Sequence, residues 1–101
     1  MESTSMRFAA AVRVLGLEAR RLGLTTPGFR SPPRLPGVDR TIRRSPRGHA
    51  TVSVVTRDRP WPAVLADLVE GVVVANRLRG ADALRARNRL WSALGAAADA
   101  A

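Results

Sequence analysis

The sequence predicts an α+β fold: an N-terminal helix, a Pro/Arg-rich connection, a β-hairpin and a C-terminal pair of helices. Three observations predict it: an apolar stripe with helical spacing near the N-terminus, a Ser-Pro-Arg-Gly turn between two short segments, and two more helical patterns after Trp61. The chain has 101 residues and twenty-nine apolar residues besides alanine. We therefore expect one small domain over residues 1–94, followed by a frayed Ala-rich tail over residues 95–101.

The first helix is expected from about Ser5 to Leu22. Its apolar residues recur at spacings of four and three, and they are Phe8, Val12, Leu15, Ala19 and Leu22. Ser5 or Ser3 can cap the start, and Gly23 stands where a left-handed residue ends a helix.

Residues 24–40 cannot continue this helix because they contain four prolines and two glycines. We expect an extended, partly polyproline connection there. Within it, the segment Ser31-Pro32-Pro33-Arg34 fits the Ser-Pro-x-Arg pattern and resembles the short turn motifs of basic minor-groove-binding tails.

A hairpin is predicted around the turn Ser45-Pro46-Arg47-Gly48, whose residues suit a type I turn followed by a left-handed glycine. In that register Ser45 pairs with His49 and Ile42 lies opposite Val52. Ala50 and Val54 share the face of Ile42. The other face then carries Thr41, Arg43, Thr51 and Ser53.

Two helices are expected to follow. The second helix starts after Trp61, with Pro62 in its first turn, and ends near Leu78; a short strand from Gly71 is the alternative for its last part. The third helix starts with Asp82 as its cap and ends at Leu94. Its apolar side should carry Ala83, Leu84, Leu90, Trp91 and Leu94.

The positive charge is concentrated in one part of the chain. All seventeen basic residues are arginine, and ten of them lie between Arg20 and Arg59, together with only two acids, Asp39 and Asp58. That window therefore carries +8 of the formal net charge of +9. A GC-rich bacterial genome explains why arginine replaces lysine, but it does not explain the clustering. The cluster indicates a surface that meets a polyanion.

Two sets of residues are candidates for binding nucleic acid, because the planar fork of arginine suits phosphate oxygens. The first set lies on the connection and the hairpin: Arg30, Arg34, Arg40, Arg43, Arg44, Arg47, Arg57 and Arg59. Two or three of these are expected to pair instead with Asp39, Asp58, Asp67 or a helix C-terminus. The second set is a polar stripe on the third helix, for which an ordinary solvated face is the favoured interpretation: Arg85, Asn88, Arg89 and Ser92.

Other side chains give weaker signals. Phe29 and Trp61 could stack on bases, although core packing is the favoured reading for Trp61. Arg87 points toward the apolar side of its helix and should reach out or pair with an acid. Asp67 and Glu70 are expected on the solvent face of the second helix.

Catalysis is not expected, because the chain has no cysteine, a single histidine and no clustered acids. No cofactor or metal is implied, no segment reaches the length of a membrane span, and a cytoplasmic location is expected.

The function expected from these observations is a small non-catalytic nucleic-acid-binding protein or accessory subunit. The alternative is a protein-interaction subunit whose segment Thr26–Gly37 docks on a larger acidic partner and becomes ordered on binding. DNA versus RNA and the oligomeric state stay open.

Overall fold

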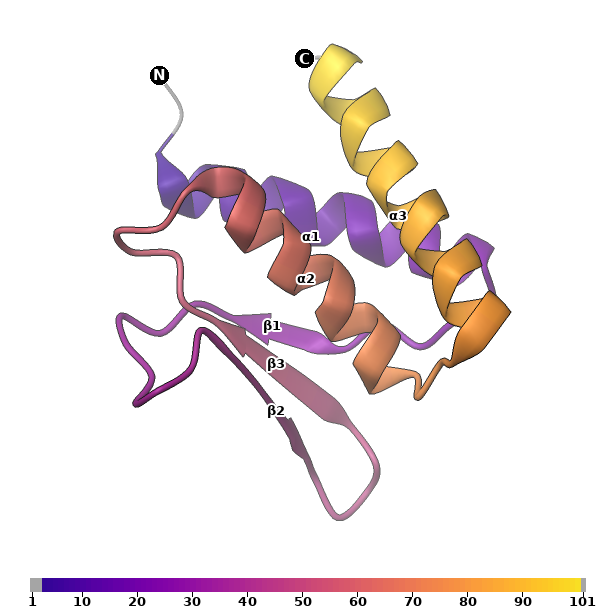
Figure 1. The fold of residues 1–101 in the computed structure, drawn as a ribbon, viewed down its shortest axis with the longest axis horizontal. Coiled ribbons are helices and arrows are strands. Elements are labelled where there is room, and N and C mark those ends of the chain that lie inside the picture. Colours follow the sequence, from indigo (N-terminus) through magenta and orange to yellow (C-terminus); the bar gives the residue numbers. More distant parts are fainter. Residues whose placement is uncertain (1–2, 101) are drawn as a thin grey trace.

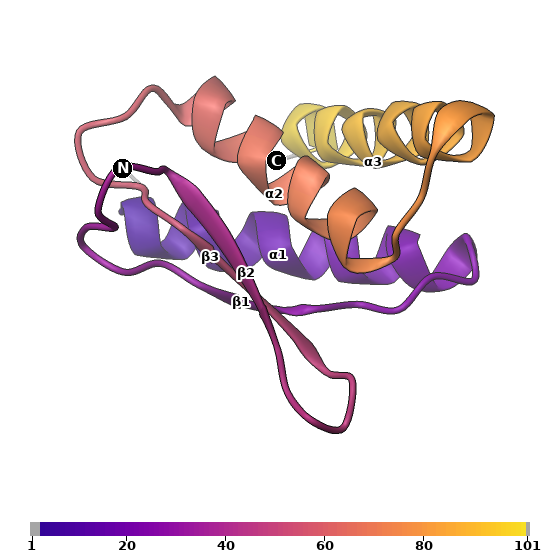
Figure 2. The ribbon, with the colours of Figure 1, turned by 60° about the horizontal axis from the view of Figure 1, so that its bottom comes forward.

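A computed structural model describes residues 3–100, which form three helices and a three-stranded sheet (Figure 1). The elements in order are α1 (Thr4–Arg21), β1 (Gly28–Arg30), β2 (Arg40–Arg44), β3 (Ala50–Val54), α2 (Trp61–Ala75) and α3 (Gly80–Ala100). This confirms the predicted α+β class and element order, with one strand more than expected. The helices lie on one side of the sheet: α2 packs across β2 and β3, and α1 and α3 pack on α2 and on each other (Figure 2).

Helix α1 has the ends that its sequence predicts. The hydroxyl of Ser3 caps the helix and accepts a hydrogen bond from the backbone N–H of Met6 at 3.2 Å. Gly23 adopts a φ of +73°, which lets the chain turn away after the last helical turn. One face of the helix packs into the core, and its buried residues are Ala11, Leu15 and Ala19.

The hairpin has the predicted register. Ile42 lies opposite Val52, and the N–H of Ser45 donates to the carbonyl of His49 at 2.8 Å. Gly48 takes the left-handed position of the turn, with a φ of +85°. Turn chemistry and the apolar pairing therefore specify the same alignment, which also decides the side of the sheet on which each hairpin arginine lies.

The Pro/Arg-rich connection contains a strand that the sequence did not predict. Gly28–Arg30 pairs in parallel with β3, so β3 becomes the central strand of the order β1-β3-β2. This pairing places Phe29 beside Val52, and Phe29 packs against the core. The strand has three residues and its partner lies more than twenty residues further along the chain, so no local pattern marks it.

The C-terminal helices agree with the favoured helical prediction but differ from it in where they begin and end. Residues 71–74 are helical, which rules out the alternative strand, and α2 ends at Ala75 rather than near Leu78. Helix α3 begins at Gly80 and continues to Ala100 instead of ending at Leu94, so the expected frayed tail is helical within the described residues. Alanine has the highest helix propensity, which is consistent with this extension. Ala101 lies outside the described residues.

Two large residues of α3 do not face the core as expected. Leu84 is 59% exposed and Trp91 is 39% exposed, whereas Ala83 and Leu90 are buried. Each exposed residue follows a buried one by a single position, which corresponds to about 100° around a helix. The stripe of α3 that packs on α1 and α2 is therefore narrower than the predicted one.

Helix α2 approaches the sheet closely at Gly71. A Cβ at this position would lie 2.7 Å from Val52 Cγ1 and 3.3 Å from Phe29 Cε1. Val52 is fully buried and its branched side chain is stiff, so it cannot move aside cheaply. The absence of a side chain at Gly71 therefore sets the distance between α2 and the central strand.

We predict that Gly71→Ala destabilises the protein by about 1–3 kcal/mol, because the added methyl overpacks this contact. Gly95→Ala is the matched control: a Cβ there meets nothing within 4 Å, so helix propensity should stabilise the protein by about 0.5 kcal/mol. Urea unfolding of both variants measures the two effects. Equal behaviour of the variants would show that the close approach at Gly71 has no energetic weight.

Candidate nucleic-acid interface

Strand β2 sends its arginines to both sides of the sheet. Successive strand residues point to opposite faces, and Ile42 packs against the core. Arg40 and Arg44 therefore share the face of Ile42 and point toward α2. Arg43 points to the opposite face, which no helix of residues 3–100 covers (Figure 2). We call this opposite side the open face.

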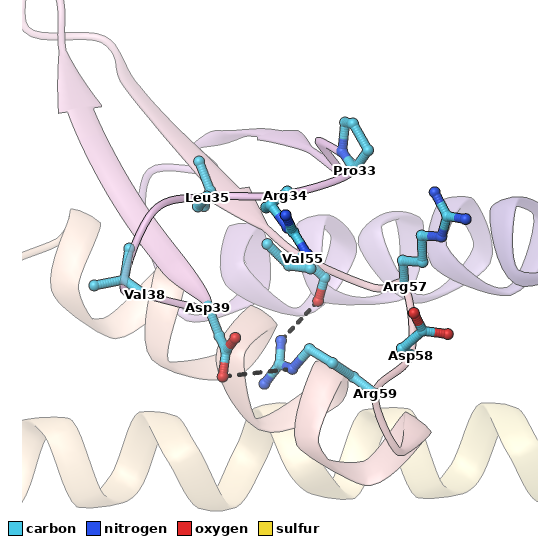
Figure 3. A pocket seen from close by; sticks show the side chains of 9 residues that line it. All are labelled: Pro33, Arg34, Leu35, Val38, Asp39, Val55, Arg57, Asp58 and Arg59. Carbon is cyan, nitrogen blue, oxygen red and sulfur yellow. Dashed lines mark hydrogen bonds and ion pairs between the residues drawn. The ribbon is translucent and has the colours of Figure 1, made fainter.

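Arg40 and Arg59 are held by one carboxylate of α2. Arg40 Nη1 lies 2.8 Å from Asp67 Oδ1, and Arg59 Nη2 lies 2.5 Å from Asp67 Oδ2. The side chains of Asp67 and Arg59 are only 16% and 14% exposed. Arg59 Nη1 also donates to the carbonyl of Val55 at 2.7 Å, and its Nε lies 3.7 Å from Asp39 Oδ2 (Figure 3). These two arginines join the sheet and its adjoining loop to α2.

Arg44 caps the C-terminal end of α2. Its Nη2 donates to the carbonyl of Val74 at 3.1 Å and its Nη1 to the carbonyl of Ala75 at 3.2 Å. A cation is favourable there because the last carbonyls of a helix are unpaired and carry partial negative charge. Together with Arg40 and Arg59, this confirms that three of the eight predicted arginines pair with acids or a helix C-terminus.

The other five arginines of the first set are exposed and have no ion-pair partner within residues 3–100: Arg30, Arg34, Arg43, Arg47 and Arg57. For the arginines within the strands, this division follows the side of the sheet on which each side chain lies. The arginines directed at α2 are bonded, and those on the open face and at its two ends are available.

Arg30 and Arg43 lie at opposite edges of the open face. The strand register arranges its side chains in two rows, Arg30-Ser53-Thr41 and Gly28-Thr51-Arg43. From strand spacing and rise, the Cα atoms of the two arginines are about 12 Å apart. Neither row contains an acid, and guanidinium and hydroxyl groups both donate hydrogen bonds to phosphate oxygens.

The open face has arginines at both of its ends. Arg47 lies in the exposed hairpin turn, and Arg34 and Arg57 lie at the other end, beyond the last residues of β1 and β3. The paired strands β2 and β3 are each five residues long, or about 17 Å. The unpaired arginines therefore extend along the whole length of the hairpin.

The end that carries Arg34 and Arg57 contains a groove of about 720 Å³ (Figure 3). It lies between the loop after β1 and the loop after β3. Its apolar wall is formed by Pro33, Leu35, Val38 and Val55. Its charged lining is mixed and consists of Arg34, Asp39, Arg57, Asp58 and Arg59.

The two loops that form the groove are tied to each other. The hydroxyls of Ser31 and Thr56 are 2.9 Å apart and share a hydrogen bond. The N–H of Val55 donates to the carbonyl of Asp39, also at 2.9 Å. These bonds hold together the segments that border the groove.

The third-helix residues lie apart from the open face. Arg85, Asn88, Arg89 and Ser92 are all exposed, but α3 packs mainly on α1 and α2 rather than on the sheet. Arg85 Nη1 is 3.4 Å from Asp82 Oδ1, in a pair in which both side chains are about 70% exposed. The structure does not bring the two predicted sets together into one surface.

Asp67 and Glu70 do not form the solvated face that the sequence suggested. Arg87 Nε donates to Glu70 Oε1 at 2.5 Å and its Nη2 to Oε2 at 3.1 Å, so the pair joins α3 to α2 and Arg87 pairs with an acid as expected. This hydrogen bond holds the pKa of Glu70 below its ordinary value of 4.5, although partial burial opposes the shift.

Sequence reasoning missed some of the residues that matter here. Asp67 was expected as one of several possible partners, but the two arginines that it binds were not identified. The open-face hydroxyls of Thr41, Thr51 and Ser53 were not counted as phosphate donors. The predicted register contained the signal for these hydroxyls, because strand residues on the side opposite to Ile42 face away from the helices. Arg40 and Arg44 could have been separated from Arg43 by the same rule.

Within residues 3–100, no three histidine, aspartate or glutamate side chains gather where they could hold a metal ion. None of the helices in that range combines the length and the apolarity that crossing a bilayer requires.

Phe29 and Trp61 are both partly buried against the core, and the Arg7 guanidinium lies 4.4 Å from the centre of the Trp61 ring.

Comparison with protein-family models, with curated proteins and with solved structures found no match to this chain.

We predict that Asp67→Ala destabilises the fold by about 2 kcal/mol, because it leaves Arg40 and the largely buried Arg59 without their shared acceptor. Asp99→Ala removes an exposed carboxylate from α3 and should change stability by less than about 0.5 kcal/mol. Thermal and urea unfolding provide the comparison. A similar small change in both variants would contradict the structural role of Asp67.

The Glu70–Arg87 pair should make stability depend on pH. Because the folded-state pKa of Glu70 is lowered, its carboxylate adds stability above its ordinary pKa of 4.5, and this is lost as the pH falls through the lowered value. We expect Glu70→Gln to be less stable than the parent at pH 7 and to match it in strong acid. In an Arg87→Gln background the same substitution should have little effect at either pH. A difference that persists in strong acid would be inconsistent with this linkage.

Proposed function

We propose that this protein binds nucleic acid without catalysing a reaction, through the open face of its sheet and the two ends of that face. The observation that carries the proposal is the distribution of the arginines. Five exposed guanidiniums without ion-pair partners in residues 3–100 occupy this one surface: Arg30, Arg34, Arg43, Arg47 and Arg57.

The side chains between these arginines also suit a phosphate backbone. Thr41, Thr51 and Ser53 offer hydroxyl donors, and neither row of the open face contains an acid that would repel a phosphate. The three strands form a nearly continuous platform on which a strand of nucleic acid could lie. A purely solvated basic face would need no such exclusion of acids.

The alternative, docking of the Pro-rich segment Thr26–Gly37 on an acidic protein, has less support. Gly28–Arg30 already pairs with β3, and the Thr26 hydroxyl donates a hydrogen bond to the carbonyl of Gly16 at 3.4 Å. Pro27 is buried. The first part of the segment is thus ordered on its own fold and does not wait for a partner to order it.

Salt dependence tests the proposed function. If the five arginines on the open face and at its two ends each neutralise one phosphate, log affinity should fall with log salt with a slope of about −4.5 on duplex and about −3.5 on a single strand. Replacing Arg43 and Arg47 by Gln should lower affinity and reduce the magnitude of the slope by about 1.8 or 1.4, respectively. Fluorescence anisotropy with labelled duplex and single strands measures both quantities.

The matched control replaces Arg13 and Arg20 by Gln. Both residues are exposed on α1, and replacing them lowers the net charge by the same amount. This variant should keep the slope of the parent. Failure of the parent to bind any strand at low salt would refute nucleic-acid binding, and equal losses in the two double variants would refute the open face as its location.

A further inference from the structure

Both acids of the basic window between Arg20 and Arg59 line the groove at one end of the open face. Asp58 has no ion-pair partner within residues 3–100. Asp39 approaches Arg59 only through Oδ2, at 3.7 Å, and its side chain is 66% exposed. The groove therefore differs from the open face, because it offers hydrogen-bond acceptors as well as cations.

This mixed lining does not suit a site for phosphate alone, because a carboxylate repels a phosphate. It does suit a nucleobase, whose edge carries N–H donors that a carboxylate accepts and acceptors that a guanidinium satisfies. The side chains of Leu35 and Val38 offer a small apolar surface beside these charged groups, against which a base can lie. The volume of about 720 Å³ lies within the range of small-ligand sites and leaves room for one nucleotide.

Guanine fits such a lining better than the other bases. Its N1–H and N2–H groups point in the same direction and match the two oxygens of one carboxylate. Its O6 and N7 atoms form the acceptor pair that arginine binds through two hydrogen bonds. Adenine and uracil have neither of these paired patterns, and cytosine offers the carboxylate a single amino group.

We infer that the groove binds one unpaired guanine nucleotide of a single strand, an inference that rests on the proposed nucleic-acid binding. Asp58 accepts hydrogen bonds from guanine N1–H and N2–H. Arg34 and Arg57 donate to O6, N7 and the adjoining phosphate. The base must be unpaired, because in a duplex its N1–H and N2–H already bond to cytosine. The rest of the strand continues along the open face toward Arg30 and Arg43.

Binding of short oligouridylates with one central guanine, adenine or cytosine, or with none, tests this inference. We expect the parent protein to bind the guanine strand about tenfold more tightly than the other three. Asp58→Asn keeps the side-chain shape and suits the positive φ of +58° at this position, but its amide offers only one acceptor. The guanine preference should disappear in this variant. Affinity for plain oligouridylate should be unchanged or slightly higher, because a negative charge is lost.

Asp99→Asn, which removes one charge from α3, is the control and should keep the preference. If Asp58→Asn folds poorly, Asp58→Gly replaces it, because glycine also tolerates the positive φ. Competition by excess guanosine monophosphate against the guanine-containing strand shows whether the rest of the strand contributes to binding. We expect the free nucleotide to compete only weakly. Competition at the affinity of the guanine strand would overturn the single-strand part of the inference.

The outcomes separate the two proposals. No binding of any strand at low salt refutes the proposed function, and the inference with it. Binding without a guanine preference, or a preference that survives in both Asp58 variants, refutes the inference and leaves the proposed function standing.

Discussion

The carboxylate of Asp67 holds together parts of the chain that lie far apart in sequence. It binds Arg40 at the start of β2 and Arg59 in the loop after β3, while Asp67 itself belongs to α2. Both arginines and the acid are largely withdrawn from water, so each charge depends on the other two for compensation. Removing one partner would leave a poorly solvated charge behind. The ion pairs of Asp67 with Arg40 and Arg59 thereby hold α2 across the sheet and position the loop that contributes Arg57 and Asp58 to the groove.

These ion pairs also determine which arginines of the surface are compensated by an acid. With Arg40, Arg44 and Arg59 bonded to α2 or its adjoining loops, the helix-side arginines are compensated locally. The arginines on the open face have no such acids nearby and must meet water, salt ions or a ligand. The two acids that do reach this side, Asp39 and Asp58, lie together in the groove. The molecule thus offers a surface with cations along its length and acceptors at one end only.

Local chemistry predicted much of the fold. The caps of α1 and the register of the hairpin follow from residues close to one another in sequence, namely Ser3, Gly23, Gly48 and the Ile42–Val52 pair. Strand β1 was not predicted because its partner strand lies far along the chain. The exposure of Leu84 and Trp91 was not predicted because it depends on how much of α3 the neighbouring helices cover. Of the candidate site, the sequence identified the arginines but not their division into bonded and available sets.

The sequence by itself determined the clustering of charge and the period-two alternation that sends Arg43 away from Arg40 and Arg44. These are properties of composition and of an extended backbone, and no distant contact is needed to produce them. Only the tertiary structure decided that Asp67 and the end of α2 lie within reach of the helix-side arginines. It also brought the loops after β1 and β3 together to enclose Asp39 and Asp58. The physical reason is that ion pairs and grooves depend on distances in space, which are set by packing between distant segments, such as the pairing of β1 with β3 and the close approach of α2 to the sheet at Gly71.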